Sequence, residues 1–235
     1  MPYARFSALI LLSFLLGACA SRQAIETRPE KSTVIVVHGL FANEFTMRSL
    51  HNGLTAADIS TLSPNLTPSD GSIGIDDLAG QLKEFIDARL APNAPIQIVA
   101  HSMGGLVSQY YLEKLGGNRR CRALYTLATP HHGTILASIH PGPAGRQMEI
   151  GSSFIKNLLR LPPPRYPVTC YRSSTDLVIL PNESATLPGA TNLIFTTPGH
   201  IYLTRDREVQ KDLVQRIKNV DHYALSVYPP LISQL

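Results

Sequence analysis

The chain has 235 residues, of which 44% are hydrophobic, 16% charged and 7% aromatic. This length and apolar content suit one domain with a large buried core, and they exclude a disordered chain. The net charge is +4, from 21 basic and 17 acidic residues. Because this excess is not gathered into a run of Lys and Arg, nucleic acid is not expected as a partner.

The first residues are expected to be a targeting segment rather than part of the fold. Arg5 supplies a positive charge, and residues 8–16 form an apolar run that is too short to span a bilayer as a stable helix. The run leads into Leu-Gly-Ala-Cys at positions 16–19, which resembles the bacterial lipobox. The resemblance implies that residues 1–18 are a lipoprotein signal peptide and that Cys19 is the lipidated first residue of the mature protein. An ordinary secretory peptide, cleaved at a nearby small residue, is the alternative.

A lipidated Cys19 would attach the protein to a membrane, since each buried CH₂ group contributes about 0.8 kcal/mol. Ala20, rather than Asp, follows it, and by resemblance to bacterial lipoproteins this favours the outer membrane of the cell envelope, facing the periplasm or the exterior. Residues 19–31 are then a polar tether, and residues 32–235 form the folded domain.

Two cysteines remain after Cys19, in a compartment that permits disulfides. Cys121 lies at the start of one predicted strand and Cys170 in the middle of a neighbouring one, which would misalign them. A disulfide and a pair of small buried hydrophobic residues both stay open.

Short apolar or β-branched runs predict strands along the whole domain, and their lack of alternation indicates a parallel sheet covered on both faces. The runs are 33–37, 96–100, 123–128, 168–171 and 192–196, with a further short strand expected within 58–62. Apolar stripes at helical spacing predict helices between them, over 47–54, 75–90, 106–115 and 209–220. This alternation predicts an α/β fold with a mostly parallel sheet. Its chemistry is expected beyond the carboxyl ends of the strands.

Ser102 follows the strand at 96–100 and precedes a helix, so a tight turn would project its hydroxyl outward. Such a turn needs small residues two positions away, and here they are Ala100 and Gly104. A hydroxyl is a weak nucleophile, so it requires a base and a site for an oxyanion. The alternative role for Ser102 is a helix N-cap.

His38-Gly39-Leu40 follows the first predicted strand. Gly39 would let the backbone bend so that the Leu40 N–H faces Ser102. Together with the Met103 N–H it would form a two-donor oxyanion hole. The His38 side chain is interpreted as a structural imidazole bonded to nearby backbone, and His101 as a packing residue.

Three motifs of this sequence resemble those of a known family: VVHGL at 36–40, AHSMGG at 100–105 and TPHHGT at 129–134. Together they resemble the α/β-hydrolase lipase and esterase family, especially small bacterial lipases, over most of the chain from 33 to about 217. Ala100 departs from the general G-x-S-x-G pattern. The resemblance implies a serine ester hydrolase that forms an acyl-enzyme on an ester or lipid substrate and needs no cofactor.

In this family the acid follows the serine in the chain, and the histidine follows the acid. Asp176 comes after the strand at 168–171 and is the candidate acid. Its alternatives are an Asx turn or a helix cap, and Glu183 is its nearest competitor.

His200 follows the last predicted strand and is the candidate base, since an imidazole exchanges protons near neutral pH. Its rivals are His222, placed past the final helix, and His131 and His132, which are expected at the rim of the pocket. No H-E-x-x-H spacing appears, so no metal site is predicted.

Residues 134–165 are the least regular part of the domain, with a helix expected within 151–161 before three prolines. A small lid over the acyl pocket and a helix packed on the sheet both remain open. Two other functions also remain: a phospholipase or acyltransferase on envelope lipids with the same three residues, and a non-catalytic envelope binding protein.

Overall fold

The computed structural model describes residues 31–227. The expected signal peptide, the lipidation site Cys19 and all but the last residue of the tether lie outside the described residues. They therefore stay predictions. In the part of the chain that the structure describes, no helix combines the length and apolar character needed to cross a membrane.

The core of the molecule is one sheet of six parallel strands in the order β2-β1-β3-β4-β5-β6. The strands are β1 (Thr33–Val37), β2 (Thr61–Leu62), β3 (Ile96–His101), β4 (Cys121–Leu127), β5 (Val168–Ser173) and β6 (Thr191–Phe195). The predicted α/β fold with a parallel sheet is confirmed. The predicted strand within 58–62 is reduced to the two residues of β2.

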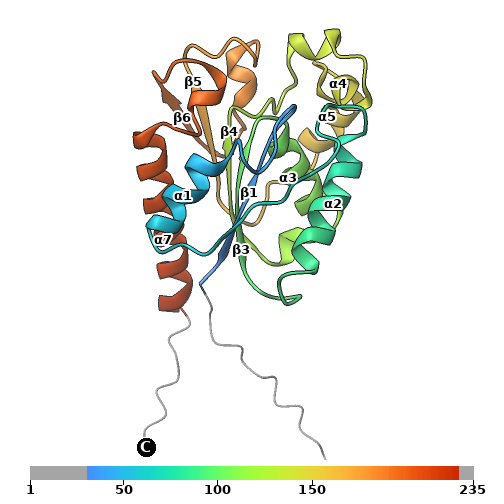
Figure 1. Cartoon of the computed structure of the whole chain (residues 1–235). Coiled ribbons are helices and arrows are strands. Elements are labelled where there is room, and N and C mark those ends of the chain that lie inside the picture. The colour runs from blue at the N-terminus through green and yellow to red at the C-terminus, as the bar shows by residue number, and fades with distance from the viewer. Residues whose placement is uncertain (1–30, 228–235) are drawn as a thin grey trace, which may run out of the picture.

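Helices cover both faces of the sheet (Figure 1). The first face carries α1 (Arg48–Ala56) and α7 (Arg207–Val227), and the second carries α2 (Ile75–Asp87), α3 (Met103–Lys114), α4 (Pro143–Met148) and α5 (Ser153–Leu159). Successive β1 residues alternate between the two cores: Val34 and Val36 face α1 and α7, whereas Ile35 and Val37 face the other side. This two-sided burial explains why the strand sequences are apolar without alternation.

The irregular segment before β5 contains a 3₁₀ turn at Ile135–Ile139 as well as α4 and α5. Ile155 of α5 is buried in the core, and Phe154 stacks on Tyr110 of α3 with ring centroids 5.7 Å apart. The expected helix therefore packs against α3 and the core, as the packed alternative predicts, and a lid formed by this segment stays a prediction.

Cys121 and Cys170 are free thiols. Cys170 pairs in register with Thr126 of β4, five residues beyond Cys121 along that strand. The strand register thus separates the two sulfur atoms, and the disulfide alternative does not hold.

A polar cluster fastens α7 to the amino ends of the strands. Asp221 of α7 accepts hydrogen bonds from the Ser32 backbone N–H and hydroxyl, the latter at 2.6 Å. It also accepts from Gln97 Nε2 and from Arg122 Nη1, each at 3.2 Å. One half-buried carboxylate therefore joins the entry to β1 and the strands β3 and β4 to the last helix.

Asp221→Ala is expected to lower the free energy of unfolding by about 2–3 kcal/mol, because it removes the carboxylate to which the buried residues Ser32 and Gln97 donate. Urea unfolding measures the loss. Lys211→Ala, at an exposed position of the same helix, is the control and is expected to change stability by less than about 0.5 kcal/mol. Equal stability of the two variants would contradict this role of Asp221.

Candidate active site

Ser102 lies between β3 and α3 in a strained backbone conformation, with φ 55° and ψ −130°. A non-glycine residue in the left-handed region costs about 1–3 kcal/mol, so packing must hold it there. Ser102 makes no side-chain capping hydrogen bond to α3. The helix-cap alternative is therefore wrong, and the hydroxyl is turned toward other partners.

Two glycines let the first turn of α3 pack against the strand ends. A Cβ on Gly104 would lie 2.3 Å from the His38 carbonyl oxygen at the end of β1. A Cβ on Gly105 would lie 2.0 Å from Thr129 Oγ1, in the segment after β4. Thr129 Oγ1 in turn donates to the Ser102 carbonyl oxygen at 3.0 Å. These close approaches hold the turn that carries Ser102.

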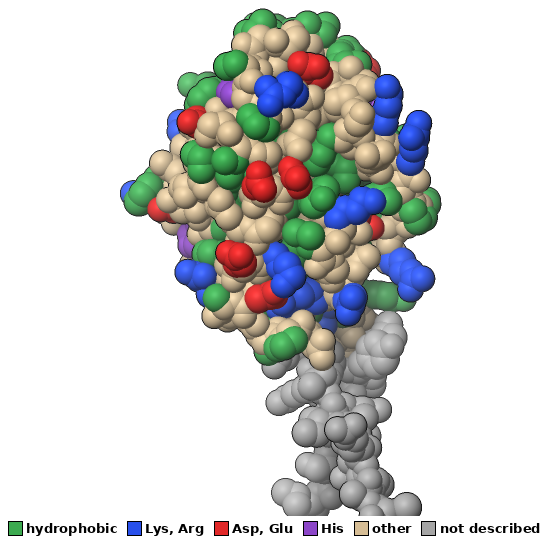
Figure 2. Space-filling view, turned by 90° about the vertical axis from the view of Figure 1, so that its right-hand side faces the viewer, with side chains coloured by type: hydrophobic (Ala, Val, Ile, Leu, Met, Phe, Trp, Pro, Cys, Tyr) green, Lys and Arg blue, Asp and Glu red, His purple; other side chains and the backbone are tan. Residues whose placement is uncertain are grey.

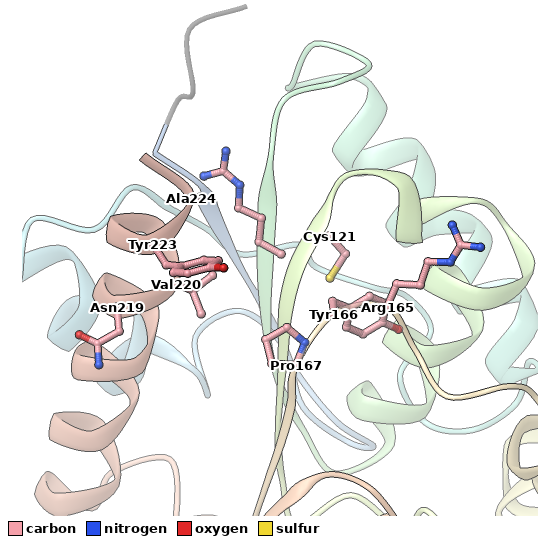
Figure 3. A pocket seen from close by; sticks show the side chains of 9 residues that line it. Cys121, Arg165, Tyr166, Pro167, Asn219, Val220, Tyr223 and Ala224 are labelled. Atoms are coloured by element: carbon pink, nitrogen blue, oxygen red, sulfur yellow. The ribbon is translucent and has the colours of Figure 1, made fainter. Parts of the chain in front are cut away.

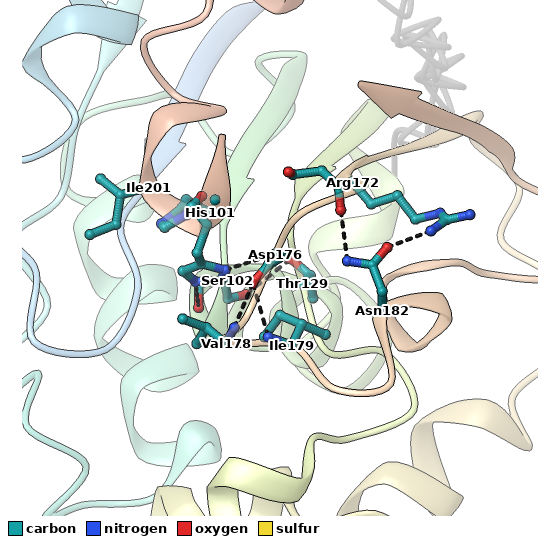
Figure 4. A network of polar contacts seen from close by, with 12 residues as sticks. His101, Ser102, Thr129, Arg172, Asp176, Val178, Ile179, Asn182 and Ile201 are labelled. Atoms are coloured by element: carbon teal, nitrogen blue, oxygen red, sulfur yellow. Dashed lines mark hydrogen bonds and ion pairs between the residues drawn. The ribbon is translucent and has the colours of Figure 1, made fainter. Parts of the chain in front are cut away.

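The structure brings together the three side chains that the sequence singled out from three strand ends. The Ser102 hydroxyl and His200 Nε2 are 2.9 Å apart, and His200 Nδ1 lies 2.8 Å from Asp176 Oδ2. Because a carboxylate only accepts, Nδ1–H is the donor to Asp176, and Nε2 accepts from the Ser102 hydroxyl. Figure 4 shows Ser102 and Asp176 close together, with the hydrogen bonds among the drawn residues dashed.

The two oxygens of Asp176 have different partners. Oδ2 accepts from His200, whereas Oδ1 accepts the backbone N–H groups of Val178 at 2.8 Å and Ile179 at 3.1 Å. The Asx-turn interpretation of this residue is thus correct for one oxygen only. Burial raises the pKa of Asp176, but the hydrogen bonds and charge of His200 and the backbone donors outweigh it, so the pKa lies below its usual value.

The loop that carries His200 is fastened on two sides. Thr175 Oγ1 accepts from the Gly199 N–H at 3.0 Å, next to Asp176 in sequence. On the other side, His101 Nε2–H donates to the His200 carbonyl oxygen at 3.2 Å, and the two rings lie with centroids 4.7 Å apart. Burial, together with the nearby His200, lowers the pKa of His101 to about 3, so His101 is neutral near pH 7. The sequence assigned this histidine to packing, without the hydrogen bond.

Gly39 lies against the nucleophile. A Cβ at this position would be 2.8 Å from Ser102 Cβ and 3.4 Å from Ser102 Oγ. Its φ is outside the left-handed region, which Phe41 occupies instead with φ 53°. The need for glycine is therefore the close approach to Ser102, and not the bend expected from the sequence. Leu40 and Met103, the expected oxyanion donors, follow Gly39 and Ser102 directly.

The competing residues lie elsewhere. Glu183 is exposed and pairs with Arg172 at 3.7 Å, and His222 is an exposed residue within α7 rather than past it. His132 is half-buried and lines a separate pocket of about 300 Å³ with Ile150.

The prediction that His131 lies at the pocket rim is wrong. His131 is 1% exposed, and its ring is held beneath the sheet end by Thr126 and Gln109, each at 2.9 Å. These two hydrogen bonds, rather than the adjacent motif residues, decide its position.

A second cavity of about 500 Å³ lies at the amino ends of the strands, remote from Ser102 (Figure 3). Cys121, Tyr166 and Pro167 form one wall and Val220 and Tyr223 of α7 the other. Among residues 31–227, no three His, Cys, Asp or Glu side chains are grouped so that they could hold a metal ion.

A parallel sheet with helices on both faces and a serine on a strained strand-to-helix turn defines an α/β-hydrolase fold. The model of a family described as "Alpha/beta hydrolase family" matches residues 34–230 of this chain. The chain therefore belongs to the alpha/beta hydrolase family. No curated protein matches its sequence at a significant level.

Solved structures share this fold at low sequence identity. Aspergillus fumigatus lipase B superposes with a TM-score of 0.70 at 18% identity over 80% of this chain, which spans only 52% of that lipase. The mature form of Bacillus licheniformis lipase BlEst2 gives 0.66 at 18% identity over 80% of this chain and 93% of its own. A thermophilic esterase from Thermogutta terrifontis gives 0.61 at 16% identity, over 81% and 90% of the two chains.

Burial lowers the pKa of His131 from 6.5 to about 3, with a smaller contribution from His132. The unfolded chain therefore binds a proton below pH 6.5 that the folded protein does not, so stability falls as the pH drops from 6.5 toward 3. The slope from one such group is about 1.4 kcal/mol per pH unit.

Replacement by a side chain that does not titrate removes this slope. Between pH 7 and pH 4.5, wild type is expected to lose about 2–3 kcal/mol more unfolding free energy than His131→Gln. Urea unfolding at the two pH values tests this. His222→Gln, at an exposed position, is the control that should behave as wild type. Identical pH dependence of His131→Gln and wild type would refute the buried, neutral state of His131.

Proposed function

We propose that the protein is a serine hydrolase of carboxylic esters. The observation that carries the proposal is the unbroken chain of hydrogen bonds from the Ser102 hydroxyl through His200 to Asp176. A hydroxyl bonded to the free nitrogen of an imidazole, with the other nitrogen held by a carboxylate, is the arrangement that activates a serine for acyl transfer.

The reaction follows from these contacts. Ser102 Oγ attacks the ester carbonyl carbon while its proton passes to His200 Nε2, and Asp176 stabilises the resulting imidazolium. The carbonyl oxygen becomes an oxyanion that accepts from the Leu40 and Met103 N–H groups. Loss of one such donor typically costs about 3–4 kcal/mol of transition-state stabilisation.

The intermediate collapses with cleavage of the bond to the alkoxy group, which leaves with the proton from His200. Water then attacks the acyl-Ser102 carbonyl and gives a proton to His200. Release of the carboxylic acid returns that proton to Ser102 Oγ, so the enzyme is restored without a cofactor.

Exposed apolar side chains in the loops around this site favour an ester with a large apolar part. They follow the carboxyl ends of four strands, with exposed fractions of 70% for Phe41, 80% for Ile139 and 76% for Leu177. The same group, called the apolar rim below, consists of Phe41, Phe45, Ile135, Ile139, Leu177, Val178, Ile201 and Tyr202. On the face in Figure 2, hydrophobic side chains likewise lie along the upper end of the molecule. Several exposed apolar side chains beside a site are typical of contact with an apolar ligand or lipid.

Ser102→Ala is expected to abolish p-nitrophenyl butyrate hydrolysis, with kcat reduced by at least about 10⁴-fold. A fluorescent alkyl phosphonate is expected to label wild type at Ser102, as read by peptide mass spectrometry, and not to label the variant. Ser138→Ala, an exposed serine on the 3₁₀ turn before α4, should be labelled and active as wild type. Labelling of Ser102→Ala at the wild-type rate would end the proposal.

The apolar rim is tested with exposed positions that do not touch Ser102. The double variant Phe45→Ser, Ile139→Ser is expected to lower hydrolysis of an emulsified long-chain triglyceride by about 5- to 20-fold, because less apolar area meets the lipid. Hydrolysis of dissolved p-nitrophenyl butyrate should stay within about twofold. Ile194→Ser, on β6 and also more than half exposed, is the control. An equal loss on both substrates, or in the control, would contradict a role of the rim in lipid contact.

A further inference from the structure

A second histidine, His38, has both ring nitrogens engaged next to the proposed oxyanion hole. The Leu66 N–H donates to His38 Nε2 at 2.9 Å, and His38 Nδ1 lies 3.0 Å from the Gly39 carbonyl oxygen. A backbone N–H only donates, so Nε2 must carry the lone pair. A carbonyl oxygen only accepts, so Nδ1 must carry the hydrogen. The partners of His38 therefore fix its tautomer.

We propose that His38 is a positioning residue that orients the Leu40 N–H toward the ester oxygen. The inference rests on the proposed function, because it concerns the transition state of that reaction. The expected role of His38, a structural imidazole bonded to backbone, agrees with these contacts. The proposal adds that the imidazole holds the peptide group between Gly39 and Leu40.

The Gly39 carbonyl and the Leu40 N–H belong to one peptide group. A trans peptide is planar, and its C=O and N–H point in opposite directions. When His38 Nδ1–H holds the Gly39 oxygen, the Leu40 N–H must lie on the far side of that plane. The peptide cannot rotate without breaking this buried hydrogen bond.

The same peptide lies at the nucleophile. A Cβ on Gly39 would approach Ser102 Oγ to 3.4 Å, so the peptide that begins at Gly39 borders the place where the ester carbonyl reacts. The next amide along the loop, the Phe41 N–H, already donates to the Ser69 carbonyl oxygen at 2.8 Å. Leu40 is thus the residue of this loop whose N–H the His38 hydrogen bond directs.

The role of His38 is geometric and does not depend on charge. His38 is 1% exposed, and burial lowers its pKa, against which the Gly39 hydrogen bond and the charge of Glu44 act only in part. A proton on Nε2 would also face the Leu66 N–H, donor against donor. The imidazole therefore stays neutral during turnover, and its two hydrogen bonds persist.

Two substitutions separate the two hydrogen bonds. The amide of Asn reaches the place of Nδ1, so His38→Asn keeps a donor for the Gly39 oxygen and loses the acceptor for Leu66. The amide of Gln reaches the place of Nε2, so His38→Gln keeps the acceptor for Leu66 and loses the donor for Gly39. His38→Phe keeps the ring volume and loses both.

The test compares p-nitrophenyl butyrate with p-nitrophenyl thionobutyrate. Sulfur is larger than oxygen and a weaker hydrogen-bond acceptor, so an oriented oxyanion donor favours the oxygen ester. His38→Gln and His38→Phe are expected to lower kcat for the oxygen ester by about 10- to 100-fold, with KM within about twofold, and to lower the oxygen-to-sulfur rate ratio by a similar factor. His38→Asn should keep kcat within about fivefold of wild type and keep its rate ratio.

Other outcomes overturn the proposal. If His38→Asn is as impaired as His38→Gln, or if kcat falls while the rate ratio is unchanged, His38 only supports the loop. His101→Phe is the matched control, because it removes another buried imidazole, on the His200 side. It should lower kcat without changing the rate ratio, and an equal change in ratio would also reject the proposal. Thermal melting of each variant verifies that it is folded.

Failure of this inference can be told from failure of the proposed function. If the phosphonate does not label wild-type Ser102, the ester hydrolase itself is wrong, and the role of His38 with it. If Ser102 is labelled and Ser102→Ala is inactive while the rate ratios of the His38 variants equal that of wild type, only the positioning role is wrong.

Discussion

The site depends on one hydrogen bond, between the Ser102 hydroxyl and His200 Nε2 at 2.9 Å, which joins residues 98 positions apart. Nothing in the local sequence of either residue provides for this contact. Parallel strands provide it, because all their carboxyl ends lie at one edge and the segments that follow β3, β5 and β6 start there together. The spacing of the strands in the sheet therefore sets the distances between the three side chains.

The histidines around this bond have separate hydrogen-bond partners. His38 donates its Nδ1–H to the Gly39 carbonyl oxygen, and His101 donates its Nε2–H to the His200 carbonyl oxygen. Burial lowers the pKa of both. Neutral imidazoles at these positions add no positive charge that would oppose an imidazolium on His200. In the proposed reaction the surrounding histidines are therefore fixed hydrogen-bond donors, and His200 alone transfers the proton.

Much of the fold and the main site residues could be read from the sequence, because both depend on local signals. Buried parallel strands are continuous apolar runs, and the chemistry follows where such runs end, which points to Ser102. Asp176 and His200 also follow strand ends, but their choice rests on the residue order that the resemblance to the α/β-hydrolase family implies. The errors arose where tertiary contacts decide. His131 is expected at the rim of the pocket, yet Thr126 and Gln109 hold it in the interior. Gly39 was explained by a bend, whereas the close approach of Ser102 excludes a side chain. Neither contact leaves a local signal.

The described part of the chain begins and ends at the same pole of the molecule. Ser32 precedes β1 at the amino edge of the sheet, and α7 runs from the carboxyl edge back toward Asp221 beside Ser32. Entry and exit of the chain are therefore at the pole opposite to Ser102. A support or a fusion partner attached beside Ser32 or at the end of α7 would lie at the pole opposite to Ser102 and would leave the mouth of the site unobstructed.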